Sequence, residues 1–432
     1  MIFIFFFIVF TAFCSAGWRQ IHWTMGDGGV SPMEMLSKAM VDSATGSVEL
    51  ALGLVGVMTL FLGLMKVAES GGMLTIVARL IRPVMVRLFP DVPPDHPAMG
   101  SMILNMSANA LGLGNAATPF GIRAMQELDR LNPFKGTATD SMVLFLAINT
   151  SNVTLLPTGV IAIRAAAGSH DPAGILPTTL FATLFSTIIA IAAAKIYGKL
   201  PFFKQTRPVE KETAGDFSKD EGAEPLLEDT RKGYPLWVSG IAFVILVFLI
   251  PVTVLFGRAI SPWIIPGLML GFLAFGVLRK VPIYEVFVEG AKEGFKVAIR
   301  IIPYLVAILV AVGMFRSSGA MDIMVGFLGT WTGMVGMPAD ALPMALLRPL
   351  SGSGAYGVMA SIINDPGIGP DSYTGYLVST LQGSTETTFY VLAVYFGAVQ
   401  IKRIRHALVA ALTADLAGII AAVAVCSFLY GG

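Results

Sequence analysis

The chain has 432 residues, of which 55% are hydrophobic and only 13% charged, and its formal net charge is +1. This composition is typical of an integral membrane protein rather than a soluble one. The near-zero charge gives no electrostatic basis for binding nucleic acid, and the two cysteines, Cys14 and Cys426, have the spacing of neither a disulfide framework nor a metal site.

Apolar stretches long enough to cross a bilayer, which takes ~20 residues as a helix, recur along the chain. We expect spans near 48–67, 139–165, 177–198, 235–256, 261–279, 298–315, 372–398 and 404–428. Residues 1–17 predict a further first helix, although they also resemble a signal peptide that lacks its positive n-region. Amphipathic segments at 32–47 and 282–301 precede two of the spans and predict helices lying in the membrane interface.

The same arrangement occurs twice. In each half a short segment interrupted by Gly, Ser or Asn, at 97–118 and 341–362, precedes an apolar span that begins with Asp-Ser. Each of those spans carries a polar patch, at 149–152 and 382–387. Interrupted hydrophobic segments in corresponding positions of two halves indicate the binding site of a secondary transporter. Non-helical backbone is tolerated at membrane depth only where it is buried or lines a cavity, so we predict a re-entrant hairpin and a broken transmembrane helix in each half.

The positions of Lys and Arg in short loops predict the orientation of the chain. Placing all these clusters in the cytoplasm inverts the second repeat relative to the first, and requires 235–256 and 261–279 to form a hairpin between them. The expected parts are a first repeat at 1–202, a charged linker at 203–234 and a second repeat at 235–432. The N-terminus and the linker are then cytoplasmic.

Long motifs give the chain a family resemblance. Residues 31–200, with DHPAMGSMILNMSANALGLGNAATP and FLAINTSNVTLLPTG, resemble the spore maturation protein A family. Residues 235–430, with RPLSGSGAYGVM and STLQGSTETTFYVLAVYFG, resemble the spore maturation protein B family. The chain thus resembles a fusion of the pair, both members of the nucleoside-recognition or Gate superfamily, which includes concentrative nucleoside transporters. This resemblance implies an all-α polytopic membrane protein with two inverted repeats, and it does not fix the substrate.

Charged residues at membrane depth are functional candidates because their burial is costly. Arg348 immediately precedes the break in the second short segment, and Glu386 lies in the polar patch of the following span. We expect Arg348 to bind an anionic group of a solute and Glu386 to couple a cation or a proton, since Arg suits bidentate recognition of an oxyanion. The alternative is a permanent Arg348–Glu386 salt bridge. Asp415, midway along the last span, is either a proton carrier or a packing residue.

The first repeat offers neutral amides and hydroxyls instead, which suit a polar solute or Na⁺, or simply bond between helices. Asp140 and Asp371 are explained better by helix capping than by binding, and Arg164 is expected to extend to water near the end of a span. The coupling-ion candidates are Glu386, Asp415 and Asn149. The predicted solute-binding residues are Asn105, Asn109, Asn115, Asn149, Ser151, Asn152, Thr154, Arg348, Ser351, Ser353, Gln382, Ser384, Thr385, Glu386 and Thr387.

The sequence has no GxxxxGK[ST] nucleotide loop, no metal-ligand run, and no histidine near a broken segment to activate a nucleophile. We therefore expect no enzyme, no resident metal and no cofactor beyond Na⁺ or H⁺ as coupling ion. The predicted function is alternating-access transport of a small anionic or zwitterionic solute, such as an amino acid or small carboxylate, across a bacterial inner membrane. A nucleoside transporter and a non-transporting membrane scaffold are the alternatives. The expected partners are the solute and the lipid bilayer, without nucleic acid, and related transporters suggest a homo-oligomer.

Overall fold

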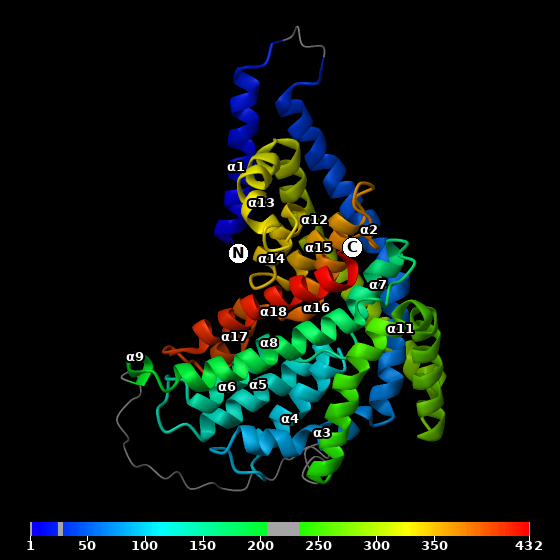
Figure 1. Cartoon of the computed structure of the whole chain (residues 1–432), viewed down its shortest axis with the longest axis vertical. Coiled ribbons are helices and arrows are strands. Elements are labelled where there is room, and N and C mark those ends of the chain that lie inside the picture. Colours follow the sequence, from blue (N-terminus) through cyan, green and yellow to red (C-terminus); the bar gives the residue numbers. More distant parts are fainter. Residues whose placement is uncertain (1, 25–28, 205–232, 432) are drawn as a thin grey trace.

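The computed structural model describes residues 2–24, 29–204 and 233–431 (Figure 1). Helices dominate this part of the chain, and no β-strand occurs in it. The first half contains α1 (Ile2–Ile21), α2 (Pro32–Ser70), α3 (Met73–Leu88), α4 (Pro97–Ala110), α5 (Gly114–Arg130), α6 (Asp140–Thr150), α7 (Thr158–Ala166), α8 (Leu176–Tyr197) and α9 (Pro201–Lys204). The second contains α11 (Leu236–Leu278), α12 (Ile283–Ser317), α13 (Ala320–Gly333), α14 (Leu342–Leu347), α15 (Gly352–Ile363), α16 (Tyr373–Ser384), α17 (Thr388–Ala398) and α18 (Ala407–Tyr430). Most of the expected linker, 205–232, lies outside the described residues.

The helices α2 to α8 and α12 to α18 follow the same order. In both halves a left-handed glycine, Gly72 or Gly319, separates the first two helices. A hydroxyl caps the helix that begins at the Asp-Ser motif, from Thr139 in one half and Ser372 in the other. Each capping hydroxyl therefore belongs to a residue next to the aspartate, and the aspartate side chains are not the caps.

Equivalent helices of the two halves pack against each other in antiparallel pairs. Along α2 and α12, Gly290 lies against Leu62 and Lys66, whereas Gly313 lies against Ser43. In the same way Gly198, after the end of α8, lies beside His406 at the start of α18. Figure 1 shows α8 and α18 side by side across the middle of the molecule. Antiparallel packing of equivalent helices is the arrangement that an inverted repeat predicts.

Small residues allow α2 and α12 to cross closely. A Cβ on Gly290 would lie 2.6 Å from the Leu62 carbonyl oxygen, and one on Gly294 would lie 2.7 Å from the Thr59 Cα. The two glycines are four residues apart and form one face, as in the small-residue contacts common between membrane helices. This crossing begins earlier than predicted, because the amphipathic segments at 32–47 and 282–301 are continuous with the spans that follow them rather than separate interfacial helices.

Within the described residues, two helices, α8 and α18, are long and apolar enough to cross a membrane, and the α2–α3 pair, bent by 68°, would give a third. Of the other predicted spans, those at 235–256, 261–279 and 298–315 lie within the longer helices α11 and α12. Those at 139–165 and 372–398 are broken in the middle, into α6 with α7 and α16 with α17. Helix α3 was not predicted from the sequence, because its arginines were interpreted as part of a short cytoplasmic loop.

The helix α11 turns back on itself. A straight helix of its 43 residues would be ~64 Å long. Its start and its end, however, both lie beside the α2–α3 elbow: the Tyr234 amide donates to the Arg79 carbonyl, and the Phe275 ring contacts Gly71. Residues 71 and 79 cannot be more than ~29 Å apart along an extended chain. The chain of α11 therefore folds back, as the predicted hairpin between the halves requires, although α11 is helical throughout.

Candidate functional site

Each half contains a helical hairpin followed by a broken helix. The hairpins are α4–α5, with its turn at 111–113, and α14–α15, with its turn at 348–351. The breaks separate α6 from α7 at 151–157 and α16 from α17 at 385–387. Both features lie at the positions where the sequence predicts them.

The hairpin tips touch the breaks through backbone hydrogen bonds. The Leu155 amide donates to the Ala110 carbonyl at 2.9 Å, and the Phe389 amide donates to the Pro349 carbonyl at 3.1 Å. A third bond joins the two breaks, from the Glu386 amide to the Thr150 carbonyl at 2.8 Å. The four irregular segments therefore meet in one place, and part of the backbone freed by helix unwinding is satisfied there.

Glycine is required at the first tip. Gly112 has φ +75, and a Cβ there would overlap the Leu156 carbonyl oxygen. At the second tip a Cβ on Gly352 would lie 2.7 Å from the Thr387 Oγ1. Both glycines thus allow the backbone of the hairpin to approach the break directly.

Replacing Gly112 by alanine is expected to destabilise the protein by more than ~2 kcal/mol, because left-handed backbone strain adds to the clash with Leu156. Gly136 is the matched control: its φ is +78 but no atom lies within 4 Å of the place that a Cβ would take, so Gly136→Ala should show the strain alone. Thermal unfolding of the two purified variants checks this. Equal loss of stability would mean that the tip–break contact is not tight.

A cavity of about 520 Å³ opens beside this meeting point. The second hairpin contributes Arg348 and Tyr356 to its wall, and the second broken helix contributes Gln382 and Glu386. A side lobe of about 130 Å³ extends between the first hairpin and the first break, where Asn109 and Thr154 line it. Arg348, Tyr356, Gln382 and Glu386 line both spaces, and we call the two together the central cavity.

Arg348 is held between the hairpin and the second break. Its side chain is 7% exposed, its Nη1 donates to the Thr387 Oγ1 at 3.2 Å, and its Nη2 donates to the Thr385 carbonyl. The Glu386 carboxylate is 3.8 Å from Nη2 and half exposed, which makes a loose ion pair. The predicted meeting of Arg348 and Glu386 is thus present, but the pair is too long to satisfy either group fully.

Gln382 and Tyr356 complete this wall. Gln382 is 2% exposed, and neither of its amide atoms has a hydrogen-bond partner among the described residues. Tyr356 extends across to the other half, where a Cβ on Gly159 would lie 2.8 Å from its hydroxyl oxygen. An amide and a phenol hydroxyl therefore lie together in this wall of the cavity.

A further part of the lining comes from the α2–α12 crossing, which was not predicted from the sequence to take part in the site. Lys66, Glu69 and Glu293 line the cavity there. Lys66 and Glu69 pair at 3.3 Å, and Glu293 pairs with Lys296 at 2.7 Å. The lining of the cavity therefore carries both signs of charge, with Lys66, the buried Arg348 and three carboxylates.

Of the predicted solute-binding residues, five line the central cavity: Asn109, Thr154, Arg348, Gln382 and Glu386. Most of the others pack or cap. Asn105 donates to the Ala117 carbonyl and to the Tyr395 hydroxyl, and Asn149 accepts from Asn109 and Tyr395.

The remaining predicted residues hold the local backbone. Ser151, Asn152 and Ser384 donate to carbonyls of the preceding turn, at Ala147, Asn149 and Leu381 respectively. Ser351 caps α15 by accepting from Gly354, and Thr385 and Thr387 accept from Arg348. Ser353 is half-buried in the first turn of α15. The side chain of Asn115 lies outside the described residues.

Asp415 lies behind the second break rather than on the cavity. It is 2% exposed, and its Oδ2 accepts from the Thr388 hydroxyl at 2.7 Å, in the first residue of α17. Its Oδ1 has no partner among the described residues. The equivalent position in the first half is occupied by hydroxyls, since Thr187 of α8 donates to the Ser151 carbonyl. A carboxylate therefore supports the second break where threonine supports the first.

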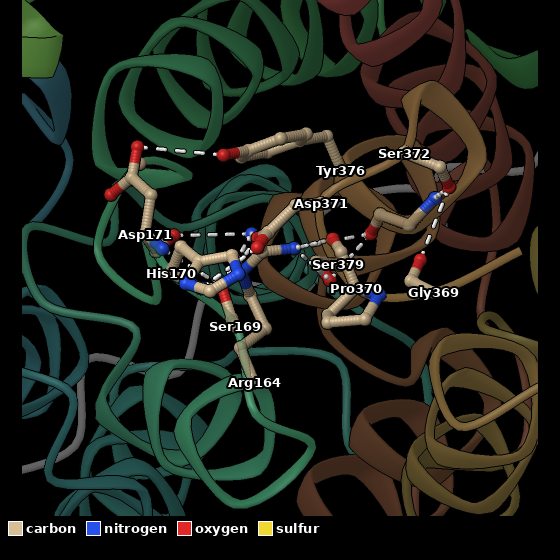
Figure 2. A network of polar contacts seen from close by, with 12 residues as sticks. Arg164, Ser169, His170, Asp171, Gly369, Pro370, Asp371, Ser372, Tyr376 and Ser379 are labelled. Atoms are coloured by element: carbon tan, nitrogen blue, oxygen red, sulfur yellow. Dashed lines mark hydrogen bonds and ion pairs between the residues drawn. The ribbon is translucent and has the colours of Figure 1, made fainter. Parts of the chain in front are cut away.

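Arg164 departs most from expectation: it is fully buried instead of extending to water (Figure 2). Its guanidinium lies 4.3 Å from the centre of the Tyr376 ring and pairs with Asp371 at 3.0 Å. It also donates to carbonyls on both sides of the contact, including those of Pro370 and Asp171. Asp371 is thus an ion-pair partner between the halves, not a helix cap, and we call this contact the Arg164 clasp.

Paired hairpins whose tips meet paired broken helices at a polar cavity define a polytopic helical membrane protein with a transport-related role. The chain belongs to the Gate family, described as nucleoside recognition, which matches residues 51–167 and 298–402. Similar proteins include spore maturation protein B of Bacillus subtilis (strain 168), 49% identical over 167 residues that make up 39% of this chain and 93% of that protein. Spore maturation protein A of the same strain is 47% identical over 159 residues, 37% of this chain and 81% of that protein.

Each relative is nearly covered by the chain, yet each covers about two fifths of it, consistent with the fusion that the sequence motifs predict. No solved structure matches the chain. The membrane-embedded helices of this family imply contact with a lipid bilayer, as predicted.

Proposed function

We propose that the protein is a secondary transporter that carries a small zwitterionic or anionic solute, an amino acid or a small carboxylate, through the central cavity. The observation that carries this proposal is Arg348, a 6% exposed cation held at the tip of the second hairpin against the second break. A buried arginine with an incomplete ion pair is suited to bind a carboxylate, because its planar guanidinium matches the two oxygens.

The carboxylates that share the cavity with Arg348 favour a zwitterion. Glu69 and Glu293 line the same cavity as Arg348, and Glu386 lies beside Arg348. An amino acid would place its carboxylate at Arg348 and its ammonium toward one of these carboxylates. The volume of about 520 Å³ lies within the ~300–1,000 Å³ usual for small-molecule sites.

Coupling to Na⁺ or H⁺ in a bacterial inner membrane completes the proposal. Of the three candidates, Glu386 is the best placed, since it lines the cavity and is half exposed. Asn149 is engaged by neighbouring amides and hydroxyls. Asp415 supports the second break and remains a candidate proton carrier, because its protonation would change the bond to Thr388.

A nucleoside is the second candidate, favoured by Tyr356 and Gln382, an aromatic ring and an amide that line the cavity together. Such a pair suits a flat, hydrogen-bonding base. The family description points the same way. Phe389 and Tyr390, the aromatics near the break in the sequence, line neither part of the central cavity.

A thermal-shift screen of the detergent-purified protein tests the proposal. Amino acids, dicarboxylates, pyridine carboxylates and nucleosides would be compared in Na⁺ and K⁺ buffers at two pH values. A ligand at a hundredfold excess over its Kd stabilises the folded state by about 2.7 kcal/mol. We expect a carboxylate-bearing hit, whereas a nucleoside hit would favour the second candidate. No response across the panel from folded protein would favour a non-transporting scaffold.

Replacing Glu386 by glutamine keeps the shape of the side chain and removes its charge. We expect the hit still to bind, because Arg348 is intact, but its binding should lose the dependence on Na⁺ or pH that the native protein shows. Titrations of the hit with native and E386Q protein in both buffers measure this. Retention of the full dependence would assign coupling elsewhere, with Asp415→Asn as the next variant.

A further inference from the structure

The central cavity has two parts that meet at a common wall. Gly159, Arg348, Tyr356 and Glu386 are among the residues that line both the main part of about 520 Å³ and the side lobe of about 130 Å³. Residues that line two adjoining spaces lie where those spaces meet. A solute whose carboxylate is bound by Arg348 therefore borders the side lobe.

The junction between the two parts is kept open by a glycine. A Cβ on Gly159 would lie 2.8 Å from the hydroxyl oxygen of Tyr356, which lines both parts as well. Gly159 lies in the first turn of α7 and is not among the glycines with positive φ, so its backbone conformation does not require glycine. What the missing side chain provides at this position is space.

The side lobe has an uncharged lining with two polar side chains of its own. None of the residues that line the lobe alone is charged, and those other than Asn109 and Thr154 are apolar or glycine. Asn109 and Thr154 are both partly exposed. The Thr154 hydroxyl donates its proton to Asn152 at 3.1 Å, so it can only accept from a guest. The Asn109 Nδ2 donates to Asn149 at 3.1 Å, and within the described residues no hydrogen bond uses the Asn109 amide oxygen.

The size and the chemistry of the lobe limit the group that it accepts. At ~30 Å³ each, the volume of a water molecule in the liquid, a lobe of about 130 Å³ holds about four non-hydrogen atoms. A hydroxyl or a carboxamide would donate to the acceptors of Asn109 and Thr154. A carboxylate would be repelled by these acceptors and by Glu386, and an ammonium group would lose its hydration in a lobe without a carboxylate of its own.

We propose that the solute is a neutral amino acid whose short side chain ends in a hydroxyl or a carboxamide, and that this side chain enters the side lobe. Asn109 and Thr154 then select the side chain, and Gly159 admits it. This inference rests on the proposed function, because it takes the binding of the solute carboxylate by Arg348 as given. A pocket that bonds a polar group of its substrate discriminates against an analogue of the same shape that lacks the group.

Binding of amino acids to the full-length chain in detergent, measured by calorimetry, tests the selection. Threonine is compared with valine and asparagine with leucine, because the members of each pair have similar shapes and differ in the donor group. Aspartate tests the effect of charge, and glycine reports on the carboxylate site without a side chain. We expect the native protein to bind threonine and asparagine at least about tenfold more tightly than valine, leucine or aspartate.

Two variants assign the selection to the lobe. Thr154→Val keeps the shape of the side chain and removes its acceptor, so the preference for threonine over valine should fall at least about fivefold, and Thr154→Ser should restore it. Gly159→Ala narrows the junction and should weaken binding of asparagine at least about tenfold more than binding of glycine. Thr45→Val is the matched control: the exposed Thr45 hydroxyl bonds within α2 and lines neither part of the cavity, so the preference should be unchanged.

The results separate this inference from the proposed function. Equal binding of both members of each pair, or a preference that survives in Thr154→Val, would overturn the selection by the lobe, whereas binding of glycine would leave the proposed function intact. Binding restricted to carboxylates without an ammonium group would also overturn the inference alone. If no carboxylate binds, glycine included, the inference and the proposed function are both wrong.

Discussion

Replacing Arg348 by lysine is expected to weaken binding of the carboxylate-bearing solute at least ~30-fold, about 2 kcal/mol. Lysine retains the positive charge but offers a point charge where the guanidinium offers a planar fork. Its single nitrogen also cannot occupy the places of the two guanidinium nitrogens that donate to the Thr387 hydroxyl and to the Thr385 carbonyl. The second hairpin would then be held less firmly against the break, which lowers affinity further.

Titration of the solute against the native and R348K proteins by thermal shift or calorimetry measures this effect. Arg316→Lys is the matched control, because Arg316 is partly exposed, pairs with Asp365 at 2.6 Å and does not line the central cavity. We expect R316K to bind as the native protein does. If R348K binds the solute with native affinity while remaining folded, Arg348 is a structural residue, and the alternative of a permanent salt bridge with Glu386 is the better account.

Loss of Arg164 is expected to have the largest effect on stability. Its guanidinium is fully buried and bonds to carbonyls, a hydroxyl and the Asp371 carboxylate, all between segments far apart in the sequence. Arg164→Ala would remove these bonds and leave Asp371 and several carbonyls without a donor. Breaking a buried ion pair from one side costs about 3–5 kcal/mol, a large part of the stability of a typical domain.

Arg316→Ala is again the comparison, because the Arg316–Asp365 pair is shorter but its arginine is 44% exposed. A pair of that kind contributes at most about 1 kcal/mol. Thermal unfolding of both variants in the same detergent should therefore show a large decrease for R164A and a small one for R316A. Similar decreases would mean that water satisfies Asp371 and the carbonyls once the arginine is gone.

The main features of the fold were predictable because they depend on local composition. Glycine, serine and asparagine interrupt apolar segments at 97–118 and 341–362, and the polar patches at 149–152 and 382–387 interrupt two spans. All four interruptions coincide with a hairpin turn or a helix break. The repeat then indicated that each tip meets its break, which brought Arg348 close to Glu386.

Contacts between distant segments were not predictable. Asn105 lies in a hairpin, where a binding residue is expected, but its amide donates to the hydroxyl of Tyr395, 290 residues away. Arg164 near the end of an apolar span looked exposed, because nothing in the sequence pairs it with Asp371. The charged wall formed by Lys66, Glu69 and Glu293 was missed for a different reason. These residues lie on α2 and α12, which were interpreted as amphipathic surface segments followed by spans. The crossing of the two helices beside the cavity depends on tertiary packing, so local sequence patterns do not indicate it.

Uptake by proteoliposomes is the measurement that tests the central claim most directly. The labelled hit from the binding screen would be added outside vesicles containing the purified chain, with an inward Na⁺ gradient, an inward H⁺ gradient or neither. We expect accumulation above the equilibrium level with one of the gradients, and its loss in R348K. Binding of the hit without movement into the vesicles under any gradient would contradict a transporter and indicate a membrane protein that binds the solute without carrying it.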